Sequence, residues 1–269
     1  MPRTLRITTR NATFQQWQAL LTNRAKRQRA GEFLVQGVRP ISLAVQHGHQ
    51  IRALLTAEGP GLSRWARELI ETARAPRAVL SAELMRELGG KDEETPELLA
   101  AVGLPADDPA RIPVRPDLLV VAFDRPTTPG NIGTLVRSAD AFGADGVIVT
   151  GHAADPYDPR AVRASTGSLF ALPVVRVPSH REVLDWAGAL GVPVQVVGTD
   201  EGGPVDLAGH DLTGPTVLVV GNETHGLSAA WRAVCDQIVR IPMVGAASSL
   251  NAASAGTVAL YEAARQRRG

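Results

Sequence analysis

The chain has 269 residues, enough for two domains, and its 44% content of hydrophobic residues supplies a sizeable core and excludes wholesale disorder. No apolar run reaches the roughly 18 to 20 residues of a membrane span, and the N-terminus lacks the apolar segment of a signal peptide. The net charge of +1 identifies no partner by itself, and the single cysteine, Cys235, excludes an internal disulfide, so we expect a reducing compartment such as the cytoplasm.

The first third of the chain has the pattern of a small α/β domain. The periodicity of its apolar residues predicts helices over 11–21, 41–46 and 62–73, and short strands over 33–35 and 51–56. Gly48 is expected to close the second of these helices. No cluster of side chains with catalytic chemistry appears in this part of the sequence.

Positive charge is concentrated at the start of this domain. Residues 1–40 contain eight basic residues and one acid, Glu32, which is an excess of seven positive charges. Such an asymmetry is typical of a face that binds a polyanion, although a solvated N-terminal segment would have the same composition. We expect phosphate contacts from the four basic residues that precede the 33–35 strand, which are Arg24, Lys26, Arg27 and Arg29.

A proline-rich stretch divides the chain. The sequence reads R-I-P-V-R-P over 111–116, and three prolines fall within the eight residues 109–116. Proline removes a backbone donor and blocks a continuous helix, so this stretch predicts a linker over 106–116. The domains would then be 1–105 and 117–269.

The second domain has a regular alternation of strands and helices. Apolar runs that predict strands occupy 118–123, 147–150, 174–177, 194–197, 217–220 and 238–241. Helical patterns lie at 132–142, 159–165, 180–190, 229–235 and about 250–267. Continuous β-branched runs that alternate with helices predict a parallel sheet covered on both faces.

Three loops at the carboxyl ends of predicted strands are rich in glycine and polar residues, and ligand sites of open α/β sheets lie at such ends. They read T-P-G-N-I-G-T-L-V-R-S-A over 128–139, V-G-N-E-T-H-G-L-S over 220–228 and I-P-M-V-G-A-A-S-S-L-N-A over 241–252. In the first loop Gly130 and Gly133 permit a tight turn into a helix that carries Arg137. A simple tight connection would use the same glycines.

The other two loops place polar groups beside the strands. Gly221 directly follows a buried strand, where a ligand or another chain segment can approach the backbone closely. Glu223 comes two residues later. It is either a functional acid of the site or an acid that lies near the N-terminus of the next helix. In the third loop Ser248 or Ser249 can cap the next helix, and capping explains Asn251, inside the first turn, less well.

Taken together and in this order, the three loops resemble the signature motifs of the SpoU family, also called the TrmH family, of RNA ribose methyltransferases in the SPOUT superfamily. The resemblance covers about 117–268, and R-A-S-T-G at 163–167 followed by L-P-V at 172–174 is similar to the family as well. The N-terminal part resembles the L30e-like RNA-binding domain of many members through G-E-F-L-V-Q-G at 31–37, where Gln36 replaces the usual acid.

The resemblance implies an α/β-knot fold, a parallel sheet whose C-terminal segment threads through a loop as a trefoil knot. It also implies that the knot loops bind the methyl donor S-adenosylmethionine. On this sequence the implied donor contacts are Thr199, Val220, Gly221, Asn222, Ile241, Met243 and Leu250. The resemblance also implies a homodimer with its sites near the subunit interface. The partner would be structured RNA, whose phosphates the charge excess assigns to the four N-terminal basic residues.

The implied reaction is the methylation of a ribose 2′-hydroxyl. This hydroxyl is a poor nucleophile until it loses its proton, and Arg137 is the family's candidate base. A guanidinium stays protonated in proteins, so Arg137 can instead position a phosphate or stabilise the alkoxide. The residues expected to orient Arg137 and the ribose are Asn131, Glu223, Ser249 and Asn251. No metal is expected, because the spacing of a metal-ligand set is absent.

Other functions fit parts of the same pattern. Methylation of a base nitrogen stays within the superfamily, and an RNA-binding protein without catalysis would use the same scaffold, but the complete motif set argues against both. A generic nucleotide-binding α/β enzyme is the residual alternative. Ribosomal RNA is favoured over transfer RNA, because several members with an L30e-like domain modify ribosomal RNA, and some of these confer antibiotic resistance.

Overall fold

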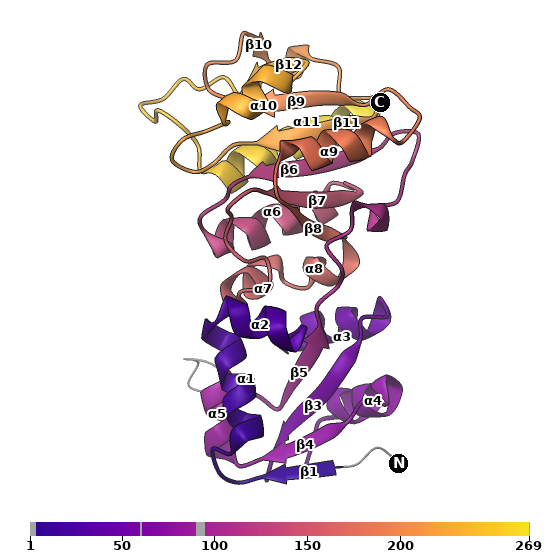
Figure 1. Cartoon of the computed structure of the whole chain (residues 1–269), viewed down its shortest axis with the longest axis vertical. Helices are drawn as coiled ribbons and strands as arrows, with labels where there is room; N and C mark the ends of the chain where they lie inside the picture. Colours follow the sequence, from indigo (N-terminus) through magenta and orange to yellow (C-terminus); the bar gives the residue numbers. More distant parts are fainter. Residues whose placement is uncertain (1–3, 60, 90–94, 269) are drawn as a thin grey trace. The chain divides into compact units, whose positions relative to one another are not determined.

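The structure, a computed structural model, describes residues 4–59, 61–89 and 95–268, so Arg3 of the basic segment lies outside it. The chain divides into two compact units (Figure 1). Unit 1 comprises Met1–Pro105 together with Tyr157–Ala171, and unit 2 comprises Ala106–Pro156 and Leu172–Gly269. The sequence pattern groups 157–171 with the second domain, because a helical pattern does not tell which core a helix joins.

The strands described in unit 1 form a five-stranded sheet. Its order is β1 (Thr4–Ile7), β4 (Arg77–Leu80), β3 (Ile51–Ala57), β5 (Leu98–Gly103) and β2 (Glu32–Gln36). Strands β1, β4 and β3 run parallel, whereas β5 is antiparallel to both β3 and β2. The predicted strands correspond to β2 and β3, and the other three lie outside the prediction.

The helices of unit 1 cover this sheet. Three of them match the predicted helices, namely α1 (Ala12–Thr22), α3 (Val38–Gln46) and α4 (Arg64–Ala73). The others are α2 (Arg24–Ala30), α5 (Ala82–Gly89), α7 (Pro159–Ser165) and α8 (Ser168–Ala171). Phe14, Trp17 and Leu20 of α1 share one buried core with Leu84 and Met85 of α5. This spacing on α1 is the apolar stripe that the sequence predicted.

The basic segment forms helix α2, which apolar periodicity does not predict because its residues are almost all polar or charged. Asn23 caps its start, since the side-chain oxygen of Asn23 accepts from the Lys26 N–H at 3.0 Å. Gly31 ends it with a φ of 64°, a left-handed conformation that suits glycine. The helix therefore fixes which of its basic side chains point outward.

The strands described in unit 2 form a seven-stranded sheet in which all neighbours are parallel, as predicted. Its order is β10 (Val205–Asp206), β12 (Gln237–Arg240), β9 (Gln195–Thr199), β11 (Thr216–Val220), β6 (Leu119–Asp124), β7 (Gly146–Thr150) and β8 (Val174–Val177). Because the strands are parallel, their carboxyl ends share one edge of the sheet. The loops after β9, β11 and β12 meet there.

Helices cover both faces of this sheet (Figure 1). On one face, α9 (His180–Gly188) and α10 (Ala229–Val234) bury Val183 and Trp231 in the core. On the other lie α6 (Pro129–Ala141) and α11 (Ala252–Arg267). A Cβ on Gly256 would lie 2.5 Å from Leu135 Cδ1 and 3.1 Å from Val220 Cγ2. Only glycine therefore lets α11 approach α6 and β11 this closely.

The predicted linker is packed as part of unit 2. It contains a short 3-10 helix, η1 (Pro109–Arg111), and Ile112 is 2% exposed within the core. The Asp107 carboxylate accepts from Arg176 Nε at 2.9 Å. The prolines thus interrupt helix formation as expected, but local composition does not reveal that the segment docks on the sheet.

Two expectations concern the chain as a whole. In the part of the chain that the structure describes, no helix has the length and apolar character to cross a membrane. The C-terminal helix α11 packs against α6 and β11. The threading that would make a trefoil knot stays a prediction of the resemblance.

Candidate functional site

A cavity of about 340 Å³ opens at the carboxyl edge of the unit 2 sheet. The loops after β9, β11 and β12 and the start of α11 form its walls. All seven residues predicted to contact the donor line this cavity, together with the predicted site residues Glu223 and Ser249. The sequence motifs lie far apart in the chain, and the parallel sheet brings them together because their strands end at the same edge.

The loop after β11 is a tight turn held by its own groups. Asn222 and Gly226 form an isolated antiparallel bridge, and Gly226 has a φ of 61°. The Asn222 side-chain oxygen accepts from the N–H groups of Thr224 and His225 at 2.9 and 3.1 Å. The Asn222 amide in turn donates to the Arg125 carbonyl at 2.6 Å. These bonds fix the loop against the end of β6.

The requirement for glycine at position 221 comes from this turn. A Cβ on Gly221 would lie 2.4 Å from the Gly226 carbonyl carbon and 2.5 Å from the Leu227 nitrogen. Of the two readings of Gly221, close approach of another chain segment is therefore the one that the structure supports. A larger residue here would displace the turn before it met a ligand.

Glu223 ties the first motif to the second. Its carboxylate accepts from the Thr127 N–H at 2.9 Å, the Thr127 hydroxyl at 3.1 Å, the Thr128 N–H at 3.0 Å and Asn131 Nδ2 at 3.0 Å. Burial on its own would raise the pKa of Glu223, but these hydrogen bonds outweigh it and lower the pKa below its ordinary value. Glu223 is therefore an ionised anchor for the start of α6.

Asn251 joins the third motif to the same network. Its Nδ2 donates to Asn131 Oδ1 at 3.1 Å. Its Oδ1 accepts from the N–H groups of Ala253 and Ser254 at 3.0 and 3.3 Å, so Asn251 is the N-cap of α11. Asn251 itself therefore caps this helix, and neither Ser248 nor Ser249 takes the capping role that the sequence also allowed.

Comparison with known protein families agrees with this arrangement. The SpoU rRNA Methylase family matches residues 118–261, more than half of the chain, and the SpoU L30e-like domain matches residues 11–100. The chain belongs to the SpoU rRNA methylase family. The motif loops described above all fall within the first of these matches.

Close relatives extend over nearly the whole chain. A "23S rRNA (uridine(2479)-2'-O)-methyltransferase" of Streptomyces viridochromogenes is 62% identical over 269 residues, which cover 99% of this chain and 94% of the relative. The crystal structure of the SpoU methyltransferase AviRb from the same organism, in complex with AdoMet, has a TM-score of 0.93 and 62% identity over 97% of this chain and 99% of that one. An AdoMet-bound rRNA methyltransferase from Sinorhizobium meliloti has a TM-score of 0.87 and 29% identity over 97% and 98%.

In this SpoU family member Arg137 lies outside the network. Its side chain is exposed on α6, and the structure records no hydrogen bond or ion pair for it within the described residues. Arg137 follows Asn131 by six positions, which places the two side chains about 120° apart around an α-helix. The structure therefore brings Asn131, Glu223 and Asn251 together but leaves Arg137 facing away from them.

Sequence reasoning missed charged residues of the cavity. Asp200 and Glu201 directly follow Thr199 at the end of β9, and Arg232 of α10 forms an ion pair with Asp200. The Asp200 carboxylate also accepts from the Gly202 N–H at 3.0 Å. An acid directly after a buried strand is a signal that could have identified Asp200. Nothing in the local sequence points to Arg232.

The basic residues of α2 divide into two groups. Arg27 is 2% exposed, its Nη1 donates to the Leu20 carbonyl at 2.6 Å, and its Nη2 lies 3.9 Å from the Asp158 carboxylate. The expectation that Arg27 contacts phosphate is therefore wrong, because its guanidinium is committed inside unit 1. Arg24, Lys26 and Arg29 are exposed. Lys26 and Arg29 also line a groove of about 510 Å³ between α1 and α2.

Proposed function

We propose that this protein transfers a methyl group from S-adenosylmethionine to a ribose 2′-hydroxyl of ribosomal RNA, as its SpoU family membership indicates. The observation that carries the proposal is that one cavity collects every residue predicted for the donor, beside the linked side chains Asn131, Glu223 and Asn251. The Streptomyces viridochromogenes relative is named for a uridine of 23S rRNA. A uridine of 23S rRNA is therefore the substrate we propose, acted on in the cytoplasm.

The lining of the cavity fits such a donor. Its volume is within the range of roughly 300 to 1,000 Å³ common for small-molecule sites. Met243 and Leu250 are 36% and 39% exposed, so a flat apolar ring in the cavity would cover them. The Glu201 carboxylate complements a cationic ligand, whereas the charge of Asp200 is balanced by Arg232 of the same cavity. When bound, S-adenosylmethionine supplies an electrophilic methyl group on a sulfonium.

The side chains of the network orient rather than exchange protons. Both oxygens of Glu223 accept hydrogen bonds and its pKa is lowered, so it is a poor proton acceptor. The amide of Asn131 is engaged on both of its polar atoms. Arg137 has an exposed guanidinium that stabilises a developing alkoxide without taking its proton, so that proton passes to solvent water as the methyl group is transferred.

We propose that a homodimer completes the site. Arg137 does not reach the Asn131 network of its own chain, and an apolar surface lies on the same helix pair. Val258 and Tyr261 of α11 are 39% and 56% exposed, and the Tyr261 ring contacts the Phe142 ring at 5.8 Å. Exposed apolar patches of this kind mark interfaces. A Tyr261→Arg variant should shift the mass measured by sedimentation from dimer to monomer.

The function is tested with labelled S-adenosylmethionine and three RNAs. The protein should label 23S rRNA, whereas 16S rRNA and transfer RNA should stay unlabelled, and mass spectrometry should place the methyl group on a ribose. A methyl group on a base would instead support methylation of a base nitrogen. Binding of S-adenosylmethionine without methyl transfer to any RNA would support an RNA-binding protein without catalysis. A role in antibiotic resistance predicts that expression of the protein protects a sensitive bacterium, which a susceptibility measurement checks.

A further inference from the structure

Arg125 combines an unfavourable backbone with a fixed guanidinium at the edge of the site. It directly follows β6 and has a φ of 49°, the left-handed region that favours glycine. The other non-glycine residues with positive φ among the described residues, Arg74 and Thr166, close helices, where this conformation is common. No helix end accounts for the conformation of Arg125.

The backbone of Arg125 does not need an arginine side chain. Its N–H donates to the Thr150 carbonyl at 3.0 Å, and its carbonyl accepts from Asn222 Nδ2 at 2.6 Å. Glycine would make both bonds without strain. Residues kept in strained conformations cluster at functional sites, so a strained arginine where glycine would suffice points to a role for the side chain.

A buried carboxylate orients this side chain. Arg125 Nε and Nη2 donate to the two oxygens of Asp124, each at 3.1 Å. Asp124 is 3% exposed and also accepts from the Ser228 N–H at 3.0 Å, so it is held firmly. The Arg125 side chain is 36% exposed and its Nη1 has no recorded partner within the described part of the chain. The outer edge of the fork is thus available to a ligand.

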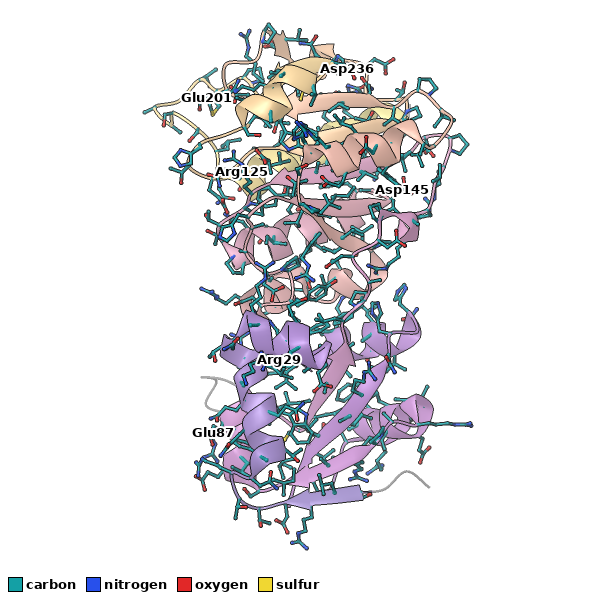
Figure 2. The ribbon with its side chains drawn as sticks, in the orientation of Figure 1. Arg29, Glu87, Arg125, Asp145, Glu201 and Asp236 are labelled. Atoms are coloured by element: carbon teal, nitrogen blue, oxygen red, sulfur yellow. The ribbon has the colours of Figure 1, made fainter. Side chains whose placement is uncertain are left out.

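The groups around Arg125 indicate which ligand its guanidinium would bind. Figure 2 shows Arg125 and Glu201 at one edge of unit 2 and Asp145 at the opposite edge. Arg125 lies two residues before Thr127, which binds Glu223, and its carbonyl holds Asn222 of the cavity. We infer that Arg125 binds a backbone phosphate of the RNA next to the methylated nucleotide and so positions the ribose. The inference rests on the proposed function.

A matched pair of variants separates this role from a structural one. Arg115 at the other edge of the sheet also pairs with a buried carboxylate, since its Nε lies 3.1 Å from Asp145, whose side chain is 3% exposed. Arg125→Gln and Arg115→Gln therefore each remove an exposed partner of a buried acid. Arg125→Gly is added because it also removes the strain and keeps the two backbone hydrogen bonds.

The measurement is the affinity for a 23S rRNA transcript as a function of salt. Arg125→Gln and Arg125→Gly should raise the dissociation constant several-fold and reduce the log–log salt slope by roughly one, whereas Arg115→Gln should leave the slope unchanged. Calorimetry with S-adenosylmethionine should give wild-type affinity for all three. The inference about Arg125 would be overturned if both Arg125 variants kept the wild-type salt slope, or if Arg115→Gln lost as much affinity and slope as they do. Either result would leave the proposed function standing. A wild-type protein that neither binds nor methylates this RNA would overturn the proposed function.

Discussion

Asn251 of the α11 N-terminus and Asn131 of α6 are joined by a hydrogen bond of 3.1 Å between Asn251 Nδ2 and Asn131 Oδ1. The other polar atom of Asn251 caps α11, and the other polar atom of Asn131 donates to Glu223. One pair of side-chain amides therefore connects all three motifs. Both polar atoms of Asn131 and both polar atoms of Asn251 take part in these hydrogen bonds.

The two roles of Asn251 can be separated by substitution. Asn251→Ser keeps an oxygen that can cap α11 but is too short to reach Asn131, so the rate of methyl transfer should fall with little change in melting temperature. Asn251→Ala should lower both, because loss of an N-cap costs about 0.5 to 2 kcal/mol. Calorimetric melting and a single-turnover assay of both variants provide the check. Equal rates in Asn251→Ser and wild type would remove Asn251 from the site.

Glu223 should make its contribution to stability depend on pH. A carboxyl with a lowered pKa stabilises the folded state fully above its ordinary value of 4.5, and this stabilisation is lost as the pH falls through the lowered pKa. Glu223→Gln should melt at a lower temperature than wild type at neutral pH, and the difference should shrink below pH 4.5. A difference that is constant with pH would show that the charge of Glu223 is unimportant.

Arg137 should affect the reaction but not the binding of the donor. Arg137→Ala should abolish methyl transfer while calorimetry gives nearly normal S-adenosylmethionine affinity, because the side chain lies outside the cavity lining. Arg137→Lys should restore the rate only in part, since an ammonium does not reproduce the planar fork. Near-normal turnover in the alanine variant would contradict any role for Arg137 in the reaction.

The three exposed basic residues of α2 should supply salt-dependent RNA affinity. Replacing Arg24, Lys26 and Arg29 by alanine should flatten the log–log salt slope by roughly two and raise the Michaelis constant for RNA, with a smaller change in the saturating rate. Arg27→Ala serves as the contrast, because it should lower the stability of unit 1 without a comparable change in slope. An unchanged slope in the triple variant would mean that α2 is only a solvated face.

The sequence alone determined the architecture and the chemistry of unit 2. Buried parallel strands must be continuous apolar runs, so each strand from β6 to β12 except the short β10 is visible locally. The motif loops follow three of those strands, so the resemblance to the family and its donor could be recognised from them, and the site residues were proposed at the same positions. Helix α2 was not predictable in this way, because its residues carry no apolar period. Strand β1 alternates Leu5 and Ile7 with Thr4 and Arg6, but its four residues are too few to stand out from the sequence around them.

Only the tertiary structure decided how individual side chains are used. The sequence presents Arg27 as one more exposed base, but Asp158 and the Leu20 carbonyl enclose it. Gly221 is required by the backbone of Gly226, and Asn251 rather than a serine caps α11. The environment of Arg27 depends on a contact with Asp158, far along the chain, and the other two outcomes depend on the conformation that each loop takes in the folded protein. Burial and hydrogen bonding are properties of the folded chain, whereas the type of a residue determines only which contacts it is able to make.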